Sequence, residues 1–137
     1  MKRHIPFSFL IAFVIAPAVF IGIGACNKKA AKYNPDFVGT WYTEAAYDST
    51  YEDIRRSELI IEKRDGLYNY RCQDTCDTHL CDCVVQQTGR ALVSFNKDKL
   101  KIGSNSSYTI RIDKEPYQDS AGNWMMQLDG LTFYKQP

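Results

Sequence analysis

The chain has 137 residues, 45% of them hydrophobic, and a formal net charge of +1. This length supports a single domain, at about 100–200 residues per domain. The neutral charge balance excludes the strongly basic surface that nucleic-acid binding requires. Aromatic residues make up 13% of the chain beside eight glycines and five prolines, which excludes collagen-like and disordered classes.

Residues 1–25 are predicted to be a signal peptide. Lys2 and Arg3 precede an uncharged and mostly apolar run over residues 5–25, which is the pattern of an export signal. The run is long enough to cross a bilayer, so a membrane-spanning anchor is the alternative. Within the run, Pro17, Gly22 and Gly24 argue against a stable spanning helix.

The sequence Ile23-Gly24-Ala25-Cys26 resembles the lipobox of bacterial lipoproteins, in which small residues precede an invariant cysteine. This resemblance implies cleavage before Cys26 and attachment of fatty acyl chains, such as palmitate, to its sulfur and its new amino group. More than one acyl chain makes membrane anchoring stable. We therefore expect lipidation at Cys26 and a location in the bacterial cell envelope. The alternative is a secreted protein with a free cysteine.

Residues 26–36 are predicted to be a lipidated, flexible tether. The segment after Cys26 is polar, lacks an apolar period and contains Pro35, which disfavours helix just before it. Its three lysines are expected to be solvated, and contact with anionic lipid headgroups is the alternative.

Residues 37–137 are predicted to form one all-β domain, because short β-type segments alternate with turn signals and no amphipathic helix is evident. Asp65-Gly66 and Asp129-Gly130 are expected to be two-residue hairpin turns. Residues 88–90 and 96–98 are two further expected turns, and residues 47–54 are either a loop or one helical turn. The expected strands are 38–46, 57–63, 67–72, 83–87, 91–96, 99–102, 107–114, 124–128 and 131–134.

Regular short strands joined by tight turns predict a small antiparallel up-and-down β-barrel, with a β-sandwich as the alternative. Phe37-Val38-Gly39-Thr40-Trp41 resembles the Gly-x-Trp opening of lipocalin-like β-barrel families. With residues 58–61, 65–68 and 131–135, it resembles small lipocalin-like bacterial lipoproteins. The resemblance implies that Gly39 permits close backbone packing and that Trp41 plugs the closed end of the barrel.

A barrel of this kind predicts a non-enzymatic protein that binds a small apolar ligand. Inward-facing side chains would contact the ligand, although the same positions would fill a barrel that has no cavity. The candidate ligand-binding residues are Trp41, Tyr68, Tyr70, Tyr108, Trp124 and Met126.

Four cysteines, Cys72, Cys76, Cys81 and Cys83, lie within 12 residues. An even number of cysteines in an exported domain predicts disulfides. The strands that end at Cys72 and begin at Cys83 are expected to face each other, which favours the pairs Cys72–Cys83 and Cys76–Cys81. Cys72–Cys81 with Cys76–Cys83 is the other pairing left open.

Metal binding by the cysteine cluster is a further alternative, because four thiolates, or three with His79, could hold zinc. The spacing lacks the usual Cys-x2-Cys pairs, so neither a metal nor a cofactor is predicted.

Catalysis is not predicted. His79 is the only histidine after residue 25, and neither a Gly-x-Ser-x-Gly motif nor a Gly-rich phosphate loop occurs. A second function class is a protein-interaction module, such as an inhibitor or an envelope-assembly partner, that acts through loops 47–55 and 73–82.

Overall fold

The computed structural model describes residues 27–74, 82–104 and 108–137. The predicted signal peptide, Cys26, Cys76, His79 and Cys81 lie outside this part. In chain order the elements are β1 (Lys28–Lys29), α1 (Ala30–Tyr33), the 3-10 helix η1 (Pro35–Phe37), β2 (Gly39–Thr43), β3 (Ala46–Asp48), β4 (Asp53–Ile61), β5 (Asp65–Gln73), β6 (Val85–Val93), β7 (Lys99–Gly103), β8 (Tyr108–Gln118), β9 (Trp124–Leu128) and β10 (Leu131–Lys135).

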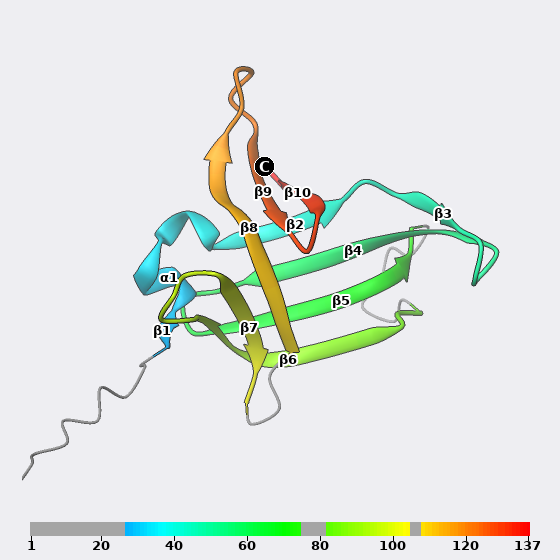
Figure 1. Cartoon of the computed structure of the whole chain (residues 1–137). Coiled ribbons are helices and arrows are strands. Elements are labelled where there is room, and N and C mark those ends of the chain that lie inside the picture. The colour runs from blue at the N-terminus through cyan, green and yellow to red at the C-terminus, as the bar shows by residue number, and fades with distance from the viewer. Residues whose placement is uncertain (1–26, 75–81, 105–107) are drawn as a thin grey trace, which may run out of the picture.

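Eight strands close into an antiparallel up-and-down barrel, as predicted (Figure 1). Strands β4 to β9 each pair with the next strand along the chain, and β2 pairs with β4. Closure comes from β10, whose Phe133 lies opposite Thr43 and whose Lys135 lies opposite Trp41 on β2. The sandwich alternative is therefore wrong, because each barrel strand has a partner on both sides.

The interior is filled by alternate side chains of the strands. On β4, for example, Ser57, Leu59 and Ile61 are buried, whereas the residues between them are partly exposed. This period of two matches a strand that has one face on a core and one on solvent. The largest fully buried side chains are Phe37, Trp41, Leu59, Ile61, Val93, Leu100, Ile102, Ile110, Met126, Leu128 and Phe133.

The two predicted Asp-Gly turns have different outcomes. Asp129 and Gly130 connect β9 to β10 with φ values of 49° and 78°, as a two-residue hairpin turn requires. Asp65 and Gly66 instead begin β5, and the turn lies over residues 62–64. Gly66 is needed for close packing, because a Cβ there would lie 2.9 Å from Cδ1 of Ile102.

The turn expected at residues 88–90 is also wrong, because β6 is continuous from Val85 to Val93. Its first half pairs with β5 and its second half with β7, and Arg90 pairs with both strands. Gly89 has φ +145°, and a Cβ on it would lie 2.6 Å from Cα of Gly103. The glycine thus lets β6 bend between its two partners without interrupting the strand.

Residues 28–36, expected to belong to the flexible tether over residues 26–36, are packed on the barrel together with Phe37. β1 pairs with the end of β6, and the side chains of Ala30 and Phe37 are fully buried. Tyr33 and Asn34 both donate hydrogen bonds to the Glu115 carboxylate on β8. Glu115 raises the pKa of Tyr33 to about 12, chiefly by accepting this hydrogen bond.

β3 and the start of β4 form a hairpin that projects beyond the barrel wall (Figure 1). Tyr47 lies opposite Ile54 in this hairpin, and among the described strands β3 pairs with β4 alone. Residues 47–54, for which the sequence left a loop or a helical turn open, are therefore mostly strand and tight turn.

Candidate functional site

The two ends of the barrel differ. We call the end with η1 and the turns at 62–64 and 94–98 the closed end, and the end with the β3–β4 hairpin the open end. Trp41 lies near the closed end with no solvent exposure, and its indole Nε1–H donates to the Phe37 carbonyl at 2.9 Å. Gly39 allows the Lys135 side chain to approach, because a Cβ on it would lie 2.4 Å from Cε of Lys135.

Tyrosines fill the lumen toward the open end. The rings of Tyr68 on β5 and Tyr108 on β8 are 5.2 Å apart, although β6 and β7 separate these strands around the barrel. The two rings therefore meet across the lumen. Burial raises the pKa of both phenols above the ordinary value of 10, so both are neutral at physiological pH.

The six predicted ligand-binding residues therefore differ in burial and in whether they line a pocket. Trp41, Tyr68 and Met126 are buried in the core, and Tyr108 and Trp124 pack against that core while partly exposed. Tyr70 alone among the six lines a pocket at the open end.

This mouth pocket has a volume of about 420 Å³ and opens to solvent between the β3–β4 hairpin and the barrel rim. Three arginines and several hydroxyl groups lie among apolar side chains, so the pocket is amphipathic rather than apolar. Its lining residues are Thr43, Glu44, Ala46, Tyr47, Asp48, Ser49, Thr50, Arg55, Arg56, Ser57, Tyr70, Arg71 and Leu131.

Arg55 is the most buried charged group of the pocket, with 7% of its side chain exposed. Its Nη1 donates to the carbonyl oxygens of Arg71 (2.8 Å) and Asp82 (3.3 Å), and its Nη2 is 3.5 Å from the Asp82 carboxylate. The Tyr51 ring covers the guanidinium at 4.3 Å. The buried Nε–H finds no acceptor among the described residues.

Arg71 reaches the pocket because the backbone is irregular there. The β4–β5 ladder shifts register between Arg56 and Glu58, and Arg71 has φ +48° on the opposite strand. A bulge of this kind turns a side chain away from the regular alternation. Arg71 forms an ion pair with Asp48 at 3.4 Å and lies 5.1 Å from the centre of the Tyr70 ring.

The Cys72–Cys83 disulfide braces the same end of the barrel, as predicted. Tyr70 lies opposite Val85 in the β5–β6 ladder, and continuing that register places Cys72 opposite Cys83. Neither sulfur is a free thiolate, so the four-thiolate zinc site does not form in this oxidised state. The predicted Cys76–Cys81 pair lies outside the described residues.

Removing this disulfide by Cys72→Ala with Cys83→Ala is expected to lower the free energy of unfolding by about 3 kcal/mol, from the loop-closure entropy of 11 residues. Urea unfolding of the oxidised protein measures the loss. Cys76→Ser with Cys81→Ser is the matched control, because it changes two cysteines and retains the Cys72–Cys83 bridge. Equal stabilities of the two double variants would contradict a stabilising role for the bridge.

The β3–β4 hairpin places exposed apolar side chains beside the pocket. Tyr47 is 68% exposed, and Ile54 and Tyr51 are also largely exposed. Leu131 lies on the facing rim, on β10. Interfaces between proteins are enriched in tyrosine and arginine, which are the side chains found here.

Of the arginines of this site, Arg55 alone lay in a predicted functional segment, as the last residue of interaction loop 47–55, and its burial was not expected. A signal for Arg55 was present, since Arg55, Ser57, Leu59 and Ile61 occupy alternate, inward-facing positions of β4. No comparable signal existed for Arg71, whose position depends on the bulge.

Comparisons with protein-family models, curated proteins and solved structures find no match to this chain. Within the described ranges, no helix is long and apolar enough to cross a bilayer. The same ranges hold no group of three or more His, Cys, Asp or Glu side chains arranged for a metal ion. The interpretation of the site therefore depends on its own geometry and chemistry.

Proposed function

We propose that this protein is a non-enzymatic lipoprotein of a bacterial envelope, anchored through Cys26, that binds a small amphipathic ligand in the mouth pocket. The lipobox-like residues 23–26 support the anchor. The observation that carries the binding function is the open pocket of about 420 Å³, in which Arg55, Arg56 and Arg71 lie beside apolar side chains.

A carboxylate or another oxygen acceptor of a ligand would form charge-assisted hydrogen bonds with the arginines that line the pocket. The apolar part of such a ligand would lie against Tyr47, Tyr70 and Leu131. This ligand differs from the purely apolar one expected from the sequence, because Tyr68 and Tyr108 occupy the lumen.

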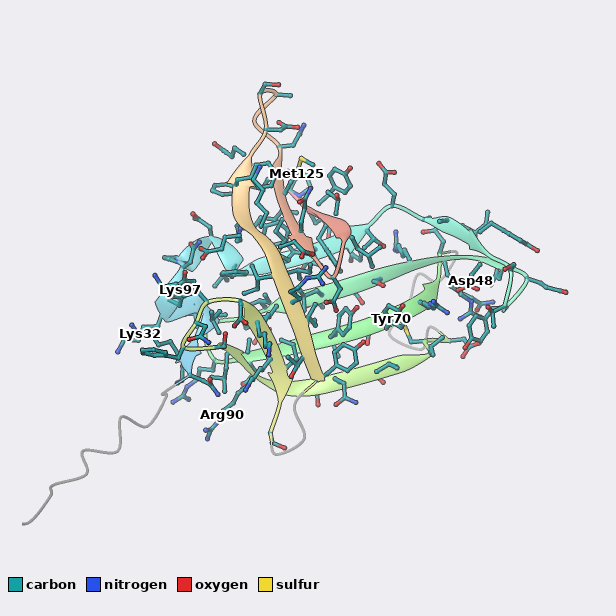
Figure 2. All side chains as sticks on the ribbon, viewed as in Figure 1. Lys32, Asp48, Tyr70, Arg90, Lys97 and Met125 are labelled. Carbon is teal, nitrogen blue, oxygen red and sulfur yellow. A yellow bond between two sulfur atoms is a disulfide. The ribbon has the colours of Figure 1, made fainter. Side chains whose placement is uncertain are left out.

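Native mass spectrometry of the protein, purified from membranes and exposed to envelope extract, tests this function. We expect the wild type to carry a small-molecule adduct, and Arg55→Lys to retain about tenfold less, since a hydrogen bond to a charged group contributes about 1.5–3 kcal/mol. Lysine preserves the charge but has no Nε–H fork. Arg90→Lys, at an exposed position of β6 (Figure 2), is the control.

Circular dichroism of both variants establishes that the barrel is intact. An adduct that Arg55→Lys and the wild type retain equally would place the ligand elsewhere. A wild type that carries no adduct from any extract would contradict small-ligand binding at this pocket.

A second candidate function is binding of another envelope protein through the β3–β4 hairpin. The exposure of Tyr47 and Ile54 beside the pocket favours it. The same spectra would then contain a complex of protein mass, which Tyr47→Ser with Ile54→Ser would remove and Arg55→Lys would leave intact.

A further inference from the structure

The segment that follows the predicted anchor at Cys26 joins the fold at Lys28, where β1 begins. Asn27 alone separates Cys26 from β1, and Lys28 already lies opposite Val93 at the closed end of β6. At about 3.3–3.6 Å per residue, a chain reaches only about 7 Å from Cys26 to Lys28. Acyl chains on Cys26 would therefore hold the closed end directly at the bilayer surface, without an intervening tether.

Five exposed lysines gather around this attachment point. Lys28 and Lys29 belong to β1, Lys32 to α1, and Lys97 to the turn at 94–98, where its ammonium lies 5.6 Å from the centre of the Tyr33 ring. Lys63, in the turn at 62–64, borders the same shallow depression as Lys32. Figure 2 shows Lys32 and Lys97 at the end of the molecule opposite Asp48 and Tyr70.

Carboxylates on the same elements offset only part of this charge. Asp36, Glu62 and Asp65 are exposed there. Asp98 accepts a hydrogen bond from the Ser94 hydroxyl at 2.7 Å, and Glu115 is engaged by Tyr33 and Asn34. With Arg64 of the turn at 62–64, six basic side chains therefore face outward against three carboxylates that have no such partner among the described residues, and an anionic lipid surface attracts such a group.

Phe95 adds an apolar group to this charged surface. It lies in the turn between β6 and β7 and is 61% exposed. Lys97 follows it by two residues, and Val93, which pairs with Lys28, precedes it by two. The turn is held in place, because the backbone N–H of Lys97 donates to the Ser94 carbonyl at 3.0 Å. A fixed, exposed aromatic ring flanked by lysines is the composition that inserts into the headgroup region of a bilayer.

We infer that the closed end is a membrane-contact surface that fits an anionic leaflet, with Phe95 inserted among the headgroups and the lysines around it. This inference rests on the proposed anchor at Cys26. It gives the protein one orientation, in which the mouth pocket and the β3–β4 hairpin face away from the membrane.

Depth-dependent fluorescence quenching tests this orientation in the full lipidated protein. Phe95→Trp is compared with Tyr47→Trp, a matched pair of exposed aromatic positions at opposite ends of the barrel. Each variant is reconstituted into vesicles of phosphatidylethanolamine and phosphatidylglycerol with brominated acyl chains. The wild type supplies the background of the two native tryptophans.

We expect quenching of the new tryptophan to be about twofold or more greater at position 95 than at position 47, because only a ring at the interface meets the bromine atoms. Raising the salt to about 1 M, where the Debye length is about 3 Å, should reduce the difference while the protein still floats with the vesicles. Equal quenching, or stronger quenching at position 47, in floating protein would overturn the orientation. Protein that fails to float would overturn the anchor and, with it, this inference.

Discussion

Replacing Cys26 with serine is expected to move the protein from the membrane fraction to the soluble fraction. Lipid attachment requires the cysteine sulfur, and serine at this position cannot accept the acyl chains. Each buried methylene of an acyl chain contributes about 0.8 kcal/mol to membrane binding, so the loss of two or more chains removes most of the affinity. The lysines of the closed end contribute about 1 kcal/mol each, which salt screens.

Fractionation with a high-salt wash measures this release. Lys32→Ser is the control, because it removes one charge near the attachment point and retains Cys26. The wild type and Lys32→Ser should stay with the membrane after the wash, whereas Cys26→Ser should not. A Cys26→Ser protein that resists the wash although its mass shows that residues 1–25 have been removed would show that lipidation at Cys26 is not the anchor.

Trp41→Ala is expected to lower the free energy of unfolding by about 3–5 kcal/mol, the usual cost of truncating a large buried aromatic side chain. The side chain is fully buried between η1 and the barrel, so its removal creates a cavity. It also removes the donor to the Phe37 carbonyl. A loss of this size is a large part of the 5–15 kcal/mol that stabilises a typical domain.

Urea unfolding of the oxidised protein separates the contribution of the buried side-chain volume from that of the hydrogen bond to the Phe37 carbonyl. Trp41→Phe keeps most of the volume and loses the hydrogen bond, which contributes about 1 kcal/mol. Tyr47→Ala, at an exposed position, should change stability by about 0.5 kcal/mol or less. Equal effects of Trp41→Ala and Tyr47→Ala would refute the assignment of Trp41 as a core residue.

Local patterns predicted much of this barrel. β9 and β10 form where alternation and the Asp129-Gly130 turn predict them, because a hairpin depends on residues close in sequence. Gly66 and Gly89 were wrongly assigned to turns, because their role depends on residues that are not close to them in the sequence. Each is small to allow the approach of a strand far along the chain, near Ile102 and Gly103, and a sequence pattern alone does not reveal that neighbour.

The candidate site was predictable to a similar extent. The Cys72–Cys83 bridge follows from strand register, which the sequence indicates. Arg55 was predicted only as the last residue of an interaction loop, and its burial was not expected because arginine is almost never fully buried. The packing of residues 28–37 depends on Glu115, whose partner Tyr33 is 82 positions away. A short polar segment gives no sign of so distant an acceptor.

Closure of the barrel by β2 and β10 has a consequence for how the chain acquires its fold. β2 lies near the start of the chain and β10 near its end. One edge of β2 therefore stays unpaired until β10, Leu131–Lys135, is available to pair with it. Unpaired edges in partly folded chains promote aggregation. Under the proposed export, a barrel that needs strands from both ends of the chain would close only after translocation, in the compartment where the cysteines can be oxidised. The ladder between β2 and β10 would thus time folding to follow export.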